Sequence, residues 1–211
     1  MMRFVLTVLV VISICACGYE PPDDGQPQQI AHDKSGAALT FGHIEQVEGT
    51  RFFTVPIVRV ENGRSGSLSK YAGTDERNRL IVDSKSGASR RVLSNADFSI
   101  VNWIEPKTRI SNTEDRMADD AAGDERSSGI YGAVVKRPGR TDKDPATYDL
   151  LLGKFEEGTQ VWASRGLAGV EAIWLTPDRK LAVVAATAEG GVFRLYDPAD
   201  FHQIMEKDLA L

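Results

Sequence analysis

Beyond residue 37 the chain is a succession of short apolar runs separated by turn-forming residues. The runs are rich in Val, Ile, Leu and aromatic residues, several alternate with polar residues, and Gly, Pro, Asn, Asp and Ser lie between them. Such runs are typical of strands in antiparallel sheets. They cover residues 38–47, 52–60, 78–83, 89–93, 98–104, 129–137, 147–155, 159–163, 170–175, 180–187 and 191–197. Their spacing predicts consecutive hairpins and a single all-β domain over residues 37–211. Trp103, Trp162 and Trp174 lie within these runs and are expected in the core.

Few segments favour a helix. Asn112 is a suitable N-cap for a short helix over the residues TEDRMADDAA that follow it, and Gly123 would end that helix. Pro198 is a suitable first residue for one turn of helix through ADFHQIM. Both helices would be minor elements of a mostly-β fold.

Two stretches resemble blades of the β-propeller family. The first is 173–184 (IWLTPDRKLAVV) followed by 191–197 (GVFRLYD), where an apolar strand leads into a Thr-Pro-Asp turn, a buried strand, a glycine turn and a strand ending in Tyr-Asp. The second is 79–93 (RLIVDSKSGASRRVL), which is similar to the outer hairpin of a blade. The usual Gly-His pair is missing, and Tyr196-Asp197 stands where Trp-Asp is common. The resemblance implies antiparallel blade-like meanders in a small or partial propeller of at most four blades, and a β-sandwich explains the same pattern.

The first sixteen residues have the layout of a secretory signal peptide. Arg3 precedes an apolar run over residues 4–14, which is too short to cross about 30 Å of hydrocarbon as a helix. The run ends in Ile14-Cys15-Ala16-Cys17, which resembles the lipobox of bacterial lipoproteins. That resemblance implies a diacylglyceryl thioether on Cys17 and cleavage before it. An uncut N-terminal anchor, or an ordinary signal peptide with incidental cysteines, is the alternative.

A flexible tether is predicted between the lipidated cysteine and the domain. Residues 18–35 are dominated by Pro, Gly, Asp and Gln, so they bury too little apolar surface to offset the cost of ordering them. In the Gram-negative lipoproteins that this chain resembles, an aspartate after the cysteine favours the inner membrane. Gly18 therefore implies the outer membrane. We expect residues 17–36 to hold the domain at that membrane, facing the periplasm.

The composition narrows the classes of partner. The net charge of −5 argues against nucleic acid, because phosphate binding needs an excess of Lys and Arg. Removal of Cys15 with the signal peptide leaves the acylated Cys17 as the remaining cysteine, so the mature chain is expected to have neither a disulfide nor a thiolate metal site. We expect no cofactor and no metal.

Residues that could support catalysis are few. Ser67 and Lys70 have the Ser-x-x-Lys spacing of penicillin-recognising enzymes, but they lie in a Gly/Ser-rich loop and the companion motifs do not follow. His43 could act as a base beside Glu45, because alternate strand residues share a face, although a surface histidine is the simpler interpretation. The acidic stretch 114–125 lacks the alternation of a calcium loop and is interpreted as a solvated loop.

A cluster of basic residues is the main candidate binding site. It consists of Arg77, Arg79, Arg90 and Arg91. These side chains would come together if residues 79–93 form a hairpin, and could then dock an acidic partner or an anionic glycan. Alternatively they pair across strands with Asp75, Glu76 and Asp83. The Gly/Ser-rich loop 62–75 beside them is the expected place for a binding surface.

Together these features predict a lipid-anchored cell-envelope protein whose β domain binds another macromolecule, such as an envelope protein, without catalysing a reaction. Two alternatives share the same anchor. One is a periplasmic serine hydrolase that uses Ser67 or another serine, and the other is a lipoprotein that inhibits an envelope enzyme or protects against it.

Overall fold

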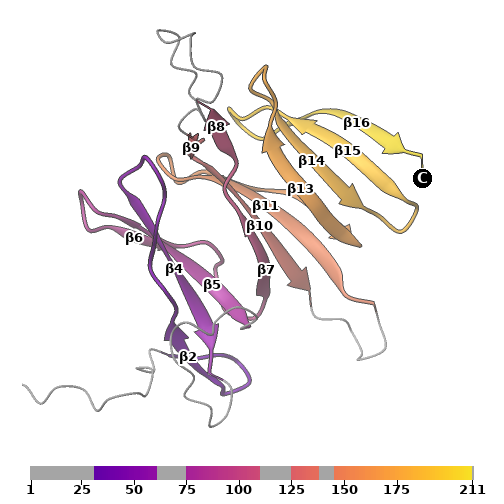
Figure 1. Ribbon diagram of the computed structural model, residues 1–211. Coiled ribbons are helices and arrows are strands. Elements are labelled where there is room, and N and C mark those ends of the chain that lie inside the picture. The colour runs from indigo at the N-terminus through magenta and orange to yellow at the C-terminus, as the bar shows by residue number, and fades with distance from the viewer. Residues whose placement is uncertain (1–30, 61–74, 110–124, 138–144, 211) are drawn as a thin grey trace, which may run out of the picture.

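The described residues form three larger antiparallel sheets, arranged side by side as propeller-like blades, and one two-stranded sheet (Figure 1). The computed structural model describes residues 31–60, 75–109, 125–137 and 145–210. Within these ranges it contains strands and turns, and no helix of a length and apolarity that would cross a membrane. The predicted all-β fold of antiparallel, blade-like meanders is confirmed.

The first and third blades are built from strands that are consecutive along the chain, whereas β8 (Lys107–Arg109) and β9 (Glu125–Ser127) lie between the first two strands of the second blade. The first blade has the order β1 (Ala31–His32), β2 (Ala38–Phe41), β4 (Phe52–Arg59), β5 (Glu76–Asp83) and β6 (Ser89–Arg91), and β3 (Glu45–Gln46) pairs with β4. The second blade consists of β7 (Ser99–Ile104), β10 (Ile130–Arg137), β11 (Thr147–Lys154) and β12 (Gln160–Leu167). The third blade consists of β13 (Gly169–Leu175), β14 (Leu181–Ala186), β15 (Gly191–Tyr196) and β16 (Gln203–Leu209). A separate hairpin pairs β8 with β9.

The second blade is buried on both faces, because the first blade packs on one face and the third blade on the other. On β11, Leu151 belongs to the buried cluster shared with the first blade, whereas Leu150 and Leu152 belong to the cluster shared with the third. Successive residues of a strand point to opposite faces, so an unbroken apolar run is what a strand buried on both faces requires. The Leu150–Leu152 run meets that requirement, and all three side chains are at most 1% exposed.

Two glycines of the second blade permit these close contacts. A Cβ on Gly132 would lie 2.6 Å from Cδ1 of Ile173 in the third blade, and a Cβ on Gly153 would overlap the ring of Tyr131. Neither position has a positive φ, so close approach of a neighbouring side chain, and not backbone conformation, explains the glycine.

The turn between the last two strands recurs in all three blades. It covers residues 83–87 (DSKSG), 154–158 (KFEEG) and 197–201 (DPADF). The fifth residue has a left-handed backbone each time, with φ of 72° at Gly87, 68° at Gly158 and 63° at Phe201. Phe201 is not a glycine, but its ring is buried in the cluster shared by the second and third blades, which offsets the cost of that conformation.

Several sequence-based expectations need correction. The helical turn expected after Pro198 is wrong: residues 198–200 form a turn and Gln203–Leu209 is β16, paired with β15. The apolar run 38–47 is two strands, β2 and β3, separated by residues 42–44. Among the described residues, strand pairing is present from Ala31 onwards. The helix expected after Asn112 lies outside the described residues.

The tryptophans do not share one environment. Trp103 and Trp162 are half-buried and pack on the cluster between the first and second blades. Trp174 was also expected in the core, but it is 39% exposed. The reason is strand alternation: its neighbour Ile173 takes the position that faces the second blade, so Trp174 points the other way.

Candidate functional site

The four arginines predicted to form a basic cluster do not share one exposed surface. Arg79 and Arg90 contact the second blade, Arg77 is held beside an aspartate, and Arg91 lies on the opposite face of β6 from Arg90. Strand alternation explains why Arg91 points away from Arg90, since adjacent residues of a strand point to opposite faces, whereas Arg77, Arg79 and Arg90 are held by the partners described below. The predicted hairpin is present, as β5 and β6, but it does not bring the four side chains together.

Arg79 is a buried structural side chain. Its guanidinium donates to both carboxylate oxygens of Glu76, at 2.8 and 3.0 Å, and its Nη1 lies 3.2 Å from Glu45. It also lies over the ring of Trp103, 4.7 Å from the centroid. The side chain is 7% exposed, so it is not available to an acidic partner. Burial raises the pKa of Glu76, and the hydrogen bonds from Arg79 act in the opposite direction.

Arg90 completes the contact between the first two blades. Its Nη2 donates to the carbonyl oxygen of Lys154 at 2.7 Å, and its Nη1 donates to the Tyr131 hydroxyl at 3.2 Å. Tyr131 stacks on Trp103 with ring centroids 4.7 Å apart. The stacked rings of Trp103 and Tyr131 therefore lie between the guanidinium groups of Arg79 and Arg90. Burial raises the pKa of the Tyr131 hydroxyl.

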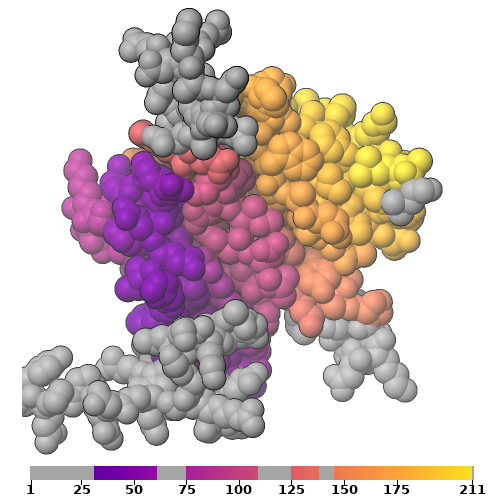
Figure 2. Space-filling model, in the orientation of Figure 1, coloured from indigo at the N-terminus to yellow at the C-terminus, as the bar shows by residue number. Residues whose placement is uncertain are grey.

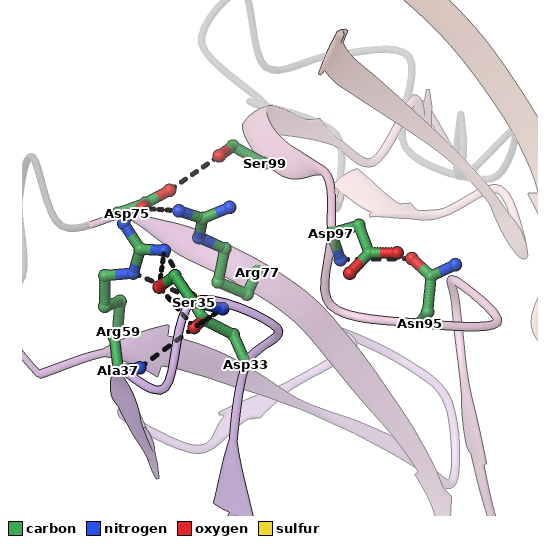
Figure 3. Close-up of polar contacts among 9 residues, drawn as sticks. All are labelled: Asp33, Ser35, Ala37, Arg59, Asp75, Arg77, Asn95, Asp97 and Ser99. Carbon is green, nitrogen blue, oxygen red and sulfur yellow. Dashed lines mark hydrogen bonds and ion pairs between the residues drawn. The ribbon is translucent and has the colours of Figure 1, made fainter. Parts of the chain in front are cut away.

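Arg77 belongs to a polar network at one end of the first blade (Figure 3). Asp75 lies 2.6 Å from Arg77 Nη2 and 3.6 Å from Arg59 Nη1, and it accepts a hydrogen bond of 2.6 Å from the Ser99 hydroxyl. Ser99 is on β7, so the network links the first two blades. Arg77 Nε is buried without a hydrogen-bond partner among the described residues.

Asp33 is the second carboxylate of this network. It accepts hydrogen bonds from the Ser35 hydroxyl at 2.6 Å and from the backbone N–H groups of Ser35 and Ala37, and it pairs with Arg59 (Figure 3). Its side chain is 3% exposed. The bond from Ser35, followed by the pairing with Arg59, lowers the pKa of Asp33 well below its usual range although burial opposes this. These contacts fix the turn between β1 and β2.

A cavity of about 260 Å³ lies on the face of the first blade that points away from the second. The turn after β1 and the loop 94–97 border it, and Leu39 and Ile57 contribute apolar lining. Its polar lining is His32, Asp33, Lys34, Asn78, Arg91, Ser94, Asn95 and Asp97. Asn78 donates to the carbonyl oxygens of Leu93 and Asn95 and accepts from two backbone N–H groups, and Lys34 pairs with Asp97. Arg91, which is exposed, is the member of the predicted cluster that borders the cavity.

The remaining sequence candidates are dispersed or lie elsewhere. His43 lies between β2 and β3 and is exposed, and Glu45, expected beside it, pairs with Arg79. His202 contacts Asp200 at 2.6 Å on the surface of the third blade. No group of three metal-ligating side chains occurs in the parts of the chain that the structure describes. Ser67, Lys70 and most of the loops 62–75 and 114–125 lie outside the described residues.

Comparison with known proteins adds little to this geometry. No family model matches the chain, and no curated protein matches it either. A solved structure described as the β-propeller domain of the Trilobed protease from Pyrococcus furiosus, with an open velcro topology, aligns at a TM-score of 0.40 and 12% identity. The alignment covers 81% of this chain and 43% of that one. The strand pairing itself defines the class of the chain, an all-β protein of antiparallel, blade-like sheets.

Proposed function

We propose that the protein is a lipid-anchored component of the bacterial cell envelope and that its β domain is a non-enzymatic binding or assembly module. The observation that carries the proposal is the lipobox-like Ile14-Cys15-Ala16-Cys17, which lies a short distance along the chain before the first strand that the structure describes. Cys17 and Ala31 are separated by residues 18–30. Such a segment spans at most about 45 Å when fully extended. An acylated Cys17 would therefore keep the domain close to the membrane that holds the lipid, which we propose is the outer membrane, on its periplasmic side.

The described polar side chains support a binding role over a catalytic one. Buried charged side chains such as Arg79, Asp33 and Asp149 are engaged by partners within the chain. Groups satisfied in this way hold blades and turns in position, and they are not poised to exchange protons with a substrate. Arg91 at the cavity is exposed and can contact an anionic group of a partner.

The proposal is tested by comparing the expressed full-length chain with its Cys17→Ser variant in the same bacterial host. We expect the wild type to sediment with membranes, to lack residues 1–16 and to carry the mass of acyl chains. We expect Cys17→Ser to keep its full length and to carry no acyl mass, because serine lacks the thiol that accepts the diacylglyceryl group. An unacylated wild type, or identical processing of both chains, would refute the anchor.

The binding role is tested separately, by crosslinking the wild-type chain on intact membranes and identifying what it captures by mass spectrometry. Arg91→Glu is the informative variant, because it reverses the charge at the cavity. Arg165→Glu is its control, since Arg165 is an exposed arginine of β12 in the second blade. Loss of a captured envelope protein with the first variant and not with the second would support the cavity as its binding surface.

A further inference from the structure

The cavity on the first blade is lined by two basic side chains that differ in how they are engaged. Lys34, on the turn after β1, pairs with Asp97 of the loop 94–97, and its side chain is 80% exposed. Arg91, on β6, forms no ion pair with any other residue that the structure describes. The cavity therefore provides one free guanidinium, and one ammonium group that can donate further hydrogen bonds.

The side-chain oxygens that line the cavity are largely occupied. Asp33 accepts hydrogen bonds from its own turn and pairs with Arg59. The side-chain oxygen of Asn78 accepts from two backbone N–H groups, and that of Asn95 accepts from the backbone N–H of Asp97 (Figure 3). The hydrogen-bonding capacity that remains free at the charged groups is that of donors. A ligand that supplies acceptors is therefore required.

The charges around the cavity indicate that this ligand is an anion. Asp33 is compensated by Arg59, and Asp97 is compensated by Lys34. The charge of Arg91 has no counter-ion among the described residues. A guanidinium matches a carboxylate through two parallel, charge-assisted hydrogen bonds. A carboxylate bound at Arg91 would balance its charge and use its donors.

The size and the apolar part of the lining favour a carboxylate carried by a polypeptide. The volume of about 260 Å³ is below the 300–1,000 Å³ or so that is typical of pockets for whole small molecules. Leu39 and Ile57 lie beside the charged groups, and none of the described residues that line the cavity is Phe, Tyr or Trp. The C–H groups of a sugar ring are attracted to the negative face of such rings, so an anionic glycan fits less well. An acidic side chain next to an apolar one fits better.

We propose that the cavity binds an acidic segment of a protein partner, with one carboxylate on Arg91, and that Asp97 holds the place on Lys34 that a second carboxylate of the partner takes. Because Lys34 is largely exposed, its pair with Asp97 is weak and can exchange for a carboxylate of the partner at little cost. Asp97 is then an internal competitor that lowers the affinity. This inference deepens the proposed binding role and rests on it, but it does not depend on the lipid.

The test is the affinity of the full-length chain, in a mild detergent, for a short fluorescent peptide of alternating Glu and Leu residues, measured by fluorescence anisotropy. A peptide with Gln in place of each Glu is the uncharged control. Arg91→Gln should weaken binding of the acidic peptide by about tenfold or more, because charge-assisted hydrogen bonds are lost. Arg165→Gln is the matched control and should leave the affinity unchanged, since Arg165 is an exposed arginine of β12 in the second blade.

Asp97→Asn tests the internal competitor. Asparagine has nearly the same shape without the charge, so Lys34 becomes available and the acidic peptide should bind about threefold more tightly. Asp208→Asn changes the net charge equally and should have no effect, because Asp208 is an exposed residue of β16 in the third blade. Figure 2 shows the third blade on the opposite side of the second from the first. Circular dichroism of each variant establishes that it is folded.

Several results would overturn the proposal. They are equal binding of the acidic and the uncharged peptide, equal affinities of the wild type and a folded Arg91→Gln chain, and an Asp97→Asn chain that binds no more tightly than Asp208→Asn. Binding of oligogalacturonate, an anionic glycan, in place of the acidic peptide would overturn it as well.

The same assay separates this inference from the proposed function. If crosslinking captures an envelope protein while the acidic peptide does not bind, the binding role stands and the acidic segment is refuted. If Cys17→Ser binds the peptide as the wild type does, the inference stands even where the anchor fails.

Discussion

The two contacts between blades consist of different types of side chain. The contact between the first and second blades combines aromatic rings with buried arginines. Across the interface, Arg79 lies over Trp103, Trp103 stacks on Tyr131, and Tyr131 contacts Arg90. The contact between the second and third blades is mainly aliphatic, with Leu150, Leu152, Ile173, Val183 and Val192 at its centre. The comparison teaches that one domain uses two ways to join blades. The contact between the first and second blades depends on the pairing of its buried charges, and the contact between the second and third blades depends on the close packing of its aliphatic side chains.

The largest effect is expected from removing the charge of Arg79. Arg79→Met leaves the carboxylate of Glu76, which is 14% exposed, without its bidentate partner, and we expect the free energy of unfolding to fall by about 3–5 kcal/mol. Urea unfolding measures this. Arg165→Met is the control, because that exposed arginine lies over the Trp162 ring and its loss should cost less than about 1 kcal/mol. The double variant Arg79→Met/Glu76→Leu should recover most of the loss, and failure to recover it would show that packing of the guanidinium, and not its charge, matters.

A cavity in the second contact should have the next largest effect. Leu152 is fully buried, and Leu152→Ala should lower the free energy of unfolding by about 2–4 kcal/mol through lost burial and the void that remains. Val161 is its cross-strand partner and is 37% exposed, so Val161→Ala should change stability by less than about 1 kcal/mol. Equal effects of the two substitutions in urea unfolding would contradict the assignment of Leu152 to a core.

Overpacking the first contact should have a smaller effect. Gly153→Ala adds a Cβ where the Tyr131 ring lies, so the ring must move, at a cost of about 1–3 kcal/mol. Gly169→Ala is the control, because a Cβ there would meet only a carboxylate oxygen of Glu171 at 3.5 Å. Near-ultraviolet circular dichroism should change for the first variant, since the stacking of Tyr131 on Trp103 is disturbed. An unchanged spectrum together with unchanged stability would argue against this packing.

The smallest effect is a dependence of stability on alkaline pH that arises in the first contact. Burial raises the pKa of Tyr131, so above pH 10 or so the unfolded state loses this proton while the folded state keeps it. Stability is therefore present below the ordinary tyrosine pKa and decreases as pH rises through the raised one. Tyr131→Phe removes this titration, so its unfolding free energy relative to wild type should increase between about pH 8 and pH 11. A constant difference would exclude Tyr131 as the titrating group.

Most strands could be predicted from the sequence, because apolar runs and the turn-forming residues between them are local features. The stretch 173–197 forms β13, β14 and β15, and 79–93 forms the β5–β6 hairpin, as the resemblance to blades implies. The strand β16 was missed because HQIMEKDL has no apolar alternation, and all seven of its strand residues are exposed. Its conformation comes from pairing with β15, which is a tertiary effect.

The candidate site was harder to predict because it depends on which face of a strand meets which neighbour. Adjacent positions such as Arg90 and Arg91 had to point to opposite faces, and the sequence alone could have excluded a four-arginine surface on that ground. That Arg79 is buried over Trp103 could not be predicted, since it requires knowing that β7 packs on β5. The exposure of Trp174 depends in the same way on which side of the third blade meets the second.

The burial of the second blade on both faces also determines how the domain loses its structure. On β11, Leu151 belongs to one buried cluster, and its neighbours Leu150 and Leu152 belong to the other. Separation of either pair of blades therefore disturbs the strand on which the other contact depends. We therefore expect a single cooperative transition on heating, with equal calorimetric and van't Hoff enthalpies, where a row of independent repeats would melt in stages. With cooperativity of this kind, the stability of the whole domain depends on the second blade, in the middle of the chain, more than on the blades at its ends.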